Sequence, residues 1–399
     1  MRKIKNYIIV ILLTISGLSA VNAQGITLSD SATLSLITCS PGPQIYALFG
    51  HTAIRLVDPA RGLDIVFNYG MFNFNKPNFY LKFIQGATDY ELGAYETKYF
   101  LPEYRERNSS VTEQMLNLTT VEKQQLADAL FVNYQPENRE YRYNFVYDNC
   151  STRPRDKILS VIKDKVVYDY VSEPQTFRNW VGTYTGENTW AKFGIDMLLG
   201  READELSTRW SSMFLPEVLC REFGAVKIIA HDGTTRSLVN AEKIIVPRQD
   251  SIVKTNFLQL PITVTLTVLL LGVLLIFYEK RRKKYYKIID SVLLIVSGLA
   301  GVIIFYLMFF SVHPLVHSNF NLLWCNPLNV LVGLFLWNRK LRSVINYFQL
   351  ANVLLFFGAL LVFVLSVQAL NVAFIPLIVL LLVRSVNWIM KKSKQLKKL

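Results

Sequence analysis

Apolar residues follow two different patterns along the chain, and these patterns divide it into two parts. Up to about residue 257, short alternating runs and helical repeats carry interspersed charges, as in a water-soluble domain. From Leu258 the chain consists of long apolar stretches, each near the ~20 residues that a bilayer requires. We count five, at about 258–278, 290–312, 321–337, 345–367 and 371–390. The third is the weakest, because Asn326-Pro327 interrupts it.

The first part mixes strand and helix patterns. Two β-rich runs, at 48–57 and 63–70, flank a Pro/Gly turn and predict a hairpin. Thr119 to Glu122 matches a capping box and predicts a helix over 120–133. A strand followed by a helix is expected next, because aromatic residues alternate at Tyr141, Tyr143, Phe145 and Tyr147 and helical spacing begins near Ser151. We therefore expect an α+β domain over 24–257 and an all-α five-helix transmembrane bundle over 258–399.

Residues 1–23 have the features of a secretory signal peptide. Three basic residues precede an apolar run, and Val21-Asn22-Ala23 supplies small residues at a cleavage position. The alternative is a retained membrane anchor, but the apolar run is short for that. The domain over 24–257 is thus expected in the periplasm.

The net charge of +13 is placed asymmetrically. Residues 279–399 contain 15 Lys and Arg against two Asp and Glu, whereas residues 24–278 carry 25 basic and 28 acidic residues. A basic protein surface for nucleic acid is therefore excluded. The basic clusters at 280–284, 339–342 and 391–398 all fall on one side of a five-span bundle, which predicts a multi-pass inner-membrane protein with a cytoplasmic C-terminus.

Cys150 is the strongest candidate nucleophile. It precedes a predicted helix whose unpaired amides and dipole favour a thiolate. The chain has four histidines, and His51, on a predicted strand of the same domain, is the best placed to act as its base. A structural role for His51 is the alternative, because the sequence pattern alone is weak evidence that His51 acts as the base for Cys150.

The segments Phe49 to Arg55 and Asp148 to Ser151 resemble the circularly permuted papain-like (NlpC-type) thiol enzymes, in which a strand histidine precedes an Asn-Cys at a helix start. The whole mature chain is similar to the Bacteroidetes-type lipoprotein N-acyltransferases. Further similar segments are Thr38 to Gly42, Phe67 to Gly70, Met213 to Pro216 and His313-Pro314.

This resemblance implies transfer of an acyl chain from a membrane phospholipid to the α-amine of a diacylated lipoprotein, through a Cys150 thioester with His51 as base. It also favours Asn68 over Asp64 as the residue that orients His51, although a turn-forming role for Asn68 is open. No cofactor is expected. A metal site is not expected either, because no His, Cys or Asp set has ligand spacing.

Several further residues are candidates for substrate binding, each with a structural alternative. Arg55 shares a strand face with His51 and could meet a phosphate or remain a solvated strand residue. Asn149 and Arg153 flank Cys150, and His313 and His317 lie in the loop between the second and third spans. Cys39 is a second thiol of the site, a disulfide partner of Cys220, or a small buried residue; the sequence leaves these open.

Two other functions are compatible with the same residues. A cysteine hydrolase, either a peptidase or an amidase acting on cell wall, would use the same pair with water as acceptor. A non-catalytic envelope receptor or assembly factor would need neither residue.

Overall fold

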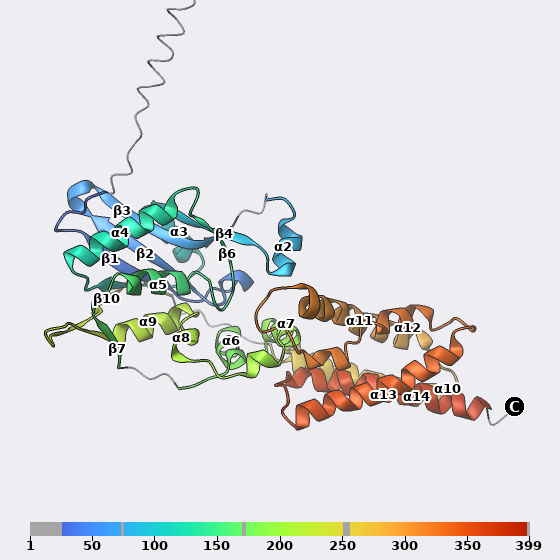
Figure 1. Cartoon of the computed structure of the whole chain (residues 1–399). Helices are drawn as coiled ribbons and strands as arrows, with labels where there is room; N and C mark the ends of the chain where they lie inside the picture. The colour runs from blue at the N-terminus through green and yellow to red at the C-terminus, as the bar shows by residue number, and fades with distance from the viewer. Residues whose placement is uncertain (1–25, 73–75, 170–172, 250–255, 397–399) are drawn as a thin grey trace, which may run out of the picture.

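A computed structural model describes residues 26–72, 76–169, 173–249 and 256–396. The predicted signal peptide lies outside these residues. A domain of strands and short helices stands at one end of a bundle of long helices (Figure 1). The α+β character of the first part and the helical character of the second are therefore as expected.

The core of the first domain is an antiparallel sheet of seven strands in the order β10-β5-β1-β2-β3-β4-β6. Its strands are β1 (Thr33–Cys39), β2 (His51–Asp58), β3 (Leu63–Met71), β4 (Asp89–Glu96), β5 (Val111–Leu116), β6 (Glu140–Arg142) and β10 (Val239–Val246). A second sheet has three strands, β7 (Lys165–Tyr168), β8 (Val226–Ile229) and β9 (Thr235–Ser237).

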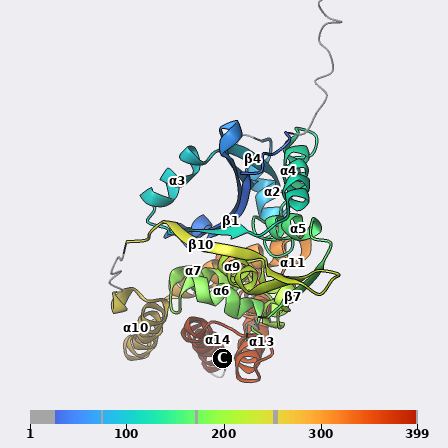
Figure 2. The ribbon, with the colours of Figure 1, turned by 90° about the vertical axis from the view of Figure 1, so that its left-hand side faces the viewer.

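Helices cover both faces of the large sheet, as Figure 2 shows for α3 and α4. Strand β1 alternates between them: Leu34 and Leu36 pack on one side, whereas Ile37 and Cys39 pack on the other. The helices of the domain are α2 (Phe79–Gln85), α3 (Thr97–Glu106), α4 (Thr120–Tyr134), α5 (Thr152–Ser160), α6 (Phe177–Thr185), α7 (Trp190–Leu198), α8 (Arg209–Ser212) and α9 (Pro216–Ala225). Four short 3₁₀ helices complete it: η1 (Ile45–Ala47), η2 (Pro59–Arg61), η3 (Arg201–Asp204) and η4 (Phe257–Gln259).

The local predictions are confirmed with one exception. The hairpin is β2–β3, and the capping box of Thr119 and Glu122 begins α4. The predicted strand through Tyr147 is wrong beyond Arg142. The side-chain oxygen of Asn144 accepts hydrogen bonds from the backbone of residues 146 and 147, and this turns the chain out of the sheet.

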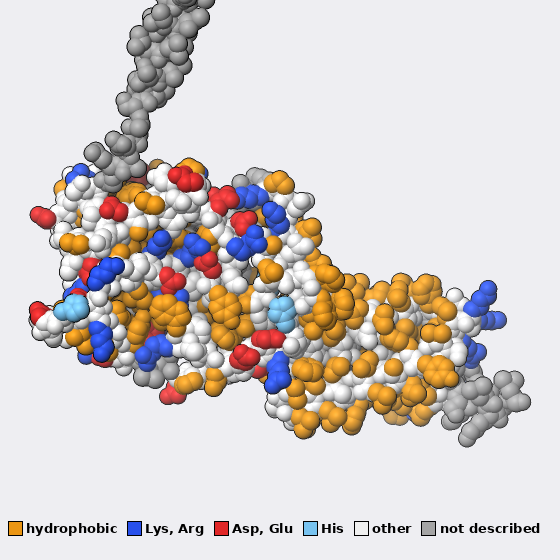
Figure 3. All heavy atoms as spheres, viewed as in Figure 1, with side chains coloured by type: hydrophobic (Ala, Val, Ile, Leu, Met, Phe, Trp, Pro, Cys, Tyr) orange, Lys and Arg blue, Asp and Glu red, His pale blue; other side chains and the backbone are white. Residues whose placement is uncertain are grey.

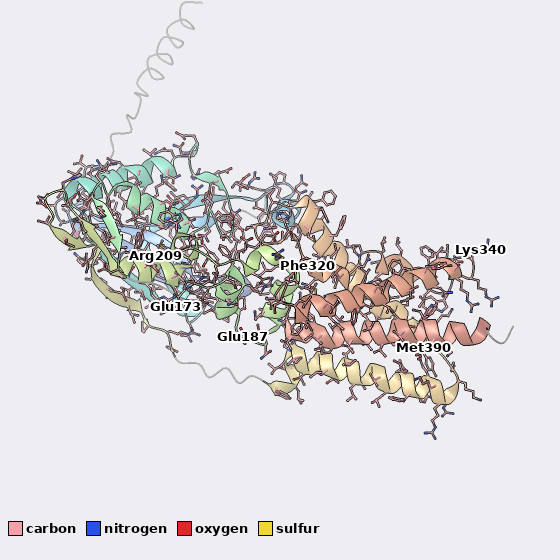
Figure 4. The ribbon with its side chains drawn as sticks, turned by 60° about the horizontal axis from the view of Figure 1, so that its bottom comes forward. Glu173, Glu187, Arg209, Phe320, Lys340 and Met390 are labelled. Atoms are coloured by element: carbon pink, nitrogen blue, oxygen red, sulfur yellow. The ribbon has the colours of Figure 1, made fainter. Side chains whose placement is uncertain are left out.

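The membrane bundle contains four long apolar helices in the described part of the chain, not five. They are α10 (Pro261–Arg282), α11 (Lys287–Phe310), α13 (Arg342–Val364) and α14 (Ile375–Leu396); a 3₁₀ helix, η6 (Val372–Phe374), precedes α14. The predicted third span, 321–337, is instead a 3₁₀ turn, η5 (Phe320–Leu323), followed after a break by the short α12 (Asn329–Phe335). This segment still runs from one end of the bundle to the other, since Phe320 and Lys340 lie at opposite ends (Figure 4).

The break is tolerated because protein covers it. Pro327 has no N–H to donate, and the freed backbone packs against α11 at Gly301, where an added methyl carbon would overlap the carbonyl oxygen of Cys325. Asn329 donates to Ser297 and accepts from Asn352. Irregular backbone within a bilayer is stable only where neighbouring helices satisfy its polar groups in this way.

Three charged side chains are buried together toward the opposite end of the bundle from the first domain. Arg384 of α14 donates to Asp290 of α11 (2.5 Å) and to Glu279 of α10 (2.9 Å), and all three are nearly inaccessible to solvent. This charged cluster ties three helices together. Removing Arg384 would leave the two buried carboxylates without their cationic partner.

The two parts of the protein are joined by polar contacts to α7 and the turn after it. Asn371 donates to the carboxylate of Asp196 (2.8 Å), and Asn319 donates to the carbonyl oxygen of Met197 (2.9 Å). The backbone N–H of Gly200 bonds the carbonyl oxygen of Leu315 (2.8 Å). These bonds fix the orientation of the first domain on the bundle.

Candidate active site

His51 is held by Asn68 from the neighbouring strand. His51 is the first residue of β2, and its Nε2 lies 2.5 Å from the side-chain oxygen of Asn68 on β3. Asn68 in turn donates its amide N–H to the hydroxyl of Tyr95 (2.7 Å), which directs its oxygen toward the histidine. Because that oxygen can only accept, Nε2 must carry the proton and Nδ1 keeps a free lone pair. The ring is thus prepared to accept a proton at Nδ1.

Cys150 lies directly before the N-cap of α5, where Asn149 fixes the backbone. The side-chain oxygen of Asn149 accepts from the backbone N–H groups of Ser151 (2.8 Å) and Thr152 (2.9 Å). Its amide group donates to the carbonyl oxygens of Phe145 and Phe214. The predicted helix start near Ser151 is confirmed, with Asn149 rather than Ser151 supplying the side-chain cap.

Gly70 brings the cysteine and the histidine into one place. A methyl carbon added to Gly70 would lie 3.5 Å from Cys150 Cβ and 3.9 Å from His51 Cε1, so the two residues flank the same small space. Gly70 has φ +94° and lies in a register shift between β3 and β4. Such a β-bulge redirects side chains at a sheet edge, and only glycine adopts this backbone without strain.

Burial favours the neutral form of both groups. Burial lowers the pKa of His51 to about 4, and burial raises the pKa of Cys150 to about 11. The backbone N–H groups of Thr52 and of Cys150 itself hydrogen-bond to the sulfur and oppose the second shift. These shifts favour a thiol over the thiolate that the helix dipole predicts, because the desolvation of the sulfur outweighs the effect of the helix terminus. The geometry suits transfer of the thiol proton to the imidazole during attack.

Two family models match the chain. The Lnb N-terminal periplasmic domain matches residues 21–182, and the Lnb transmembrane domain matches residues 253–396. The chain belongs to the Lnb family. No curated protein and no solved structure matches it.

Membership of the Lnb family gives the chain a periplasmic N-terminal domain, a membrane-spanning C-terminal domain, and a place among enzymes of lipoprotein processing. His51, Asn68 and Cys150 all fall within the matched periplasmic domain. The permuted papain-like fold, which no solved structure tests, stays a prediction.

Arg55 and Arg153, expected to bind substrate, are each paired with carboxylates in this Lnb protein. Arg55 contacts both side-chain oxygens of Asp64 (2.7 and 2.8 Å) and also bonds Glu113. Arg153 pairs with both oxygens of Asp148, and its guanidinium group lies over the ring of Tyr141. Carboxylates of the protein thus compensate both charges, and the substrate-binding roles expected of Arg55 and Arg153 stay predictions.

Asn149 is likewise engaged by other groups of the protein. It is buried, and the four hydrogen bonds already described use both its oxygen and its amide group. These bonds position Cys150, and the substrate-binding role expected of Asn149 stays a prediction.

Cys39 lies directly across from His51 in the β1–β2 pairing and is fully buried. Its thiol is hydrogen-bonded to the side chain of Tyr104 on the α3 side of the sheet. The thiol of Cys220 is hydrogen-bonded to the side chain of Thr38 on the other side. A Cys39–Cys220 disulfide is therefore excluded, and all four cysteines are free. Burial raises the pKa of Cys39 far above its usual range, so this thiol is a poor nucleophile beside Cys150.

His313 and His317 dock the loop after α11 and do not reach the Cys150 site. His313 Nε2 bonds the carbonyl oxygen of Phe83 in α2 (2.9 Å), and its ring packs on Gly86. His317 Nδ1 bonds the carbonyl oxygen of Met308 (2.9 Å). The substrate-binding role expected of both stays a prediction, and the contacts themselves are structural.

Three contributors to the site were not foreseen. An isolated glycine in a strand pattern indicates a bulge, so Gly70 had a detectable sequence signature. Tyr95 and the backbone N–H of Thr52 had none, because their roles depend on how β4 and α5 lie against β2 and β3.

Proposed function

We propose that this protein is a lipoprotein N-acyltransferase, in which Cys150 carries the acyl group and His51 transfers protons. The observation that carries this proposal is the Asn68-oriented His51 beside Cys150, in a periplasmic domain fixed to a membrane bundle. Membrane attachment favours a reaction between two lipid-anchored substrates over one between soluble substrates.

In the first half-reaction, His51 Nδ1 takes the Cys150 thiol proton as the sulfur attacks the ester carbonyl carbon of a phospholipid. The tetrahedral intermediate collapses, the protonated His51 gives that proton to the departing alkoxide, and a lysophospholipid leaves. Cys150 then holds the acyl chain as a thioester.

In the second half-reaction, the α-amine of a diacylated lipoprotein attacks the thioester carbonyl carbon. His51 takes a proton from the nitrogen and returns it to the sulfur as the carbon–sulfur bond breaks. The products are an N-acylated lipoprotein and free Cys150. The N–H groups of Thr52 and Cys150, which already point at the sulfur, are suited to stabilise the oxyanion in both halves.

This reaction requires the site to face the outer leaflet of the inner membrane, with the C-terminus in the cytoplasm. The placement of the basic clusters supports this orientation. Lys and Arg side chains gather at the end of the bundle remote from the first domain, beyond a band of apolar side chains (Figure 3).

The test uses purified full-length protein in detergent with phospholipid, with and without a diacylated lipopeptide. Mass spectrometry should show an acyl adduct on Cys150 without the lipopeptide, and equal amounts of lysophospholipid and triacylated lipopeptide with it. Cys150→Ala should abolish both products. Cys220→Ala, on α9 beside Thr38, is the matched control and should retain activity.

Separate replacement of Cys39 distinguishes a second catalytic thiol from a buried one. Release of free fatty acid or cleavage of peptide, without N-acylated lipopeptide, would favour the hydrolase instead. Retention of cellular lipoprotein N-acylation by Cys150→Ala and His51→Ala variants would favour a non-catalytic factor.

A further inference from the structure

Helix α2 presents apolar side chains to the surroundings of the protein. Tyr80, Leu81, Phe83 and Ile84 are between 48% and 73% exposed, although the helix is only seven residues long. Phe79 alone is buried beneath them. A cluster of large exposed apolar residues on one short element indicates a surface that meets another apolar phase.

The position of α2 is fixed by the membrane bundle. The backbone N–H of Val312, two residues after α11, bonds the carbonyl oxygen of Gln85 (2.8 Å), and His313 bonds that of Phe83 (2.9 Å). The last turn of α11 carries the exposed residues Phe309 and Phe310. The apolar surface of α2 is therefore continuous with the lipid-facing surface of α11, at the corner where the two meet (Figures 1 and 3).

A series of aromatic rings leads from α2 toward Cys150. Neighbouring rings have centroids 4.2–6.0 Å apart in the order Phe83, Phe79, Phe72, Tyr90, Tyr143. Tyr90 lies in the hydrophobic core cluster against which both Tyr143 and Cys150 pack. We call these five residues the aromatic series; it links the exposed helix to the nucleophile.

We propose that α2 inserts into the outer leaflet of the membrane and that its exposed face receives an acyl chain of the donor phospholipid, which passes along the aromatic series to Cys150. The continuity with the lipid-facing surface of α11 identifies lipid as the occupant. Lys82, exposed on the same helix, is placed to meet the phosphate of the headgroup. This inference rests on the proposed function.

Insertion of α2 is tested by photocrosslinking. A benzophenone amino acid at Leu81 of the full-length protein, in vesicles of phosphatidylethanolamine and phosphatidylglycerol, should give a phospholipid adduct by mass spectrometry. The same amino acid at Val132, which is 59% exposed on α4, is the control and should give none. Absence of an adduct at position 81 overturns the insertion whatever the enzyme's activity.

Delivery is tested by kinetics with two acyl donors. Leu81→Asp with Ile84→Asp should lower thioester formation from vesicle phospholipid roughly 10-fold or more, because two apolar contacts with lipid are lost. Formation from a water-soluble short-chain p-nitrophenyl ester should be unchanged. The control pair Val121→Asp with Val132→Asp, exposed on α4, should change neither rate.

An unchanged vesicle rate in the α2 variant, or an equal fall with both donors, overturns delivery through α2. Failure of the wild-type protein to form a thioester with either donor would instead contradict the proposed function, so the two failures are distinguishable.

Discussion

His51 is held in one tautomer because Asn68 offers it only an acceptor. Two candidates on the neighbouring strand could have oriented it, Asn68 and Asp64. Spacing alone could not choose, because the register of the hairpin decides which side chain lies near His51. In the structure, Arg55 and Thr97 engage Asp64, which leaves Asn68 for the histidine.

The same residues show which properties of single side chains the sequence alone cannot predict. Cys150 and His51 could be chosen as candidates from residue type and pattern, but the effect of burial on their pKa values could not be predicted. Desolvation depends on how completely β2, β3 and α5 close around them, and it reverses the effect expected from the helix terminus. Likewise, only packing reveals that Arg55 and Arg153 are already neutralised.

The first prediction concerns pH. Because burial lowers the pKa of His51 to about 4, the acidic limb of kcat/KM for thioester formation should lie near that pH and not near 6.5. The protein should also lose stability as pH falls from 6.5 to about 4, since only the unfolded state binds the proton in that window. Initial rates and thermal unfolding across this range test both. An acidic limb at 6.5 would contradict the assignment.

At the scale of elements, the β-bulge at Gly70 determines the site as much as any side chain does. The sequence predicted the hairpin, but the pairing of β3 with β4 that creates the bulge joins Asn68 to Gly93 and Met71 to Glu91, which are far apart in the sequence. The predicted strand through Tyr147 failed for a related reason, since a local side-chain hydrogen bond from Asn144 overrode the aromatic alternation.

Gly70→Ala should therefore slow the enzyme without unfolding it. The methyl group would occupy the space between Cys150 and His51, and we expect a fall in kcat/KM of roughly 10- to 100-fold. Backbone strain should cost about 1–2 kcal/mol. Gly62→Ala is the matched control, because Gly62 also has positive φ (+64°) but no atom within 4 Å of its added carbon. Equal activities of the two variants would refute this role.

The interrupted third span, at 321–337, is the other element that was predicted only in part from the sequence. Asn326-Pro327 indicated that the helical span would be interrupted. The packing of the irregular backbone against α11 could not be predicted, because it depends on glycines that lie elsewhere in the sequence. Gly301→Ala should destabilise the bundle by about 1–3 kcal/mol, because its methyl group would overlap the Cys325 carbonyl.

Gly358→Ala on α13 is the control for this change. The nearest atom to its added carbon is Leu323 Cδ1 at 4.0 Å, so the methyl group is accommodated. Thermal unfolding in detergent should rank Gly301→Ala below both the wild type and Gly358→Ala. A Gly301→Ala protein as stable as the control would argue against the close packing.

At the scale of the whole molecule, hydropathy and charge predicted the division into a periplasmic domain and a membrane domain. They could not predict how one domain packs on the other, because that contact uses scattered polar residues such as Asn319, Asn371 and Asp196. The number of crossings also matters here, since an even number would place the C-terminus in the periplasm.

Reporter fusions test the topology. Alkaline phosphatase joined after residue 257 should be active, and the same reporter joined after residue 399 should be inactive, because we expect five crossings and a cytoplasmic C-terminus. A fluorescent protein that folds only in the cytoplasm should give the opposite pattern. Active phosphatase at the C-terminus would mean that the 320–340 segment does not cross.

The charged cluster of Glu279, Asp290 and Arg384 bears on how the protein is made. The two carboxylates are synthesised with α10 and α11, but their arginine follows only with α14, about a hundred residues later in translation. Until the last helix arrives, Glu279 in the last turn of α10 and Asp290 in the first turn of α11 lack the arginine that pairs with them in the folded bundle. A chain ending before Arg384 should thus be recognised by membrane proteases as incomplete, which makes the last helix the step that completes assembly.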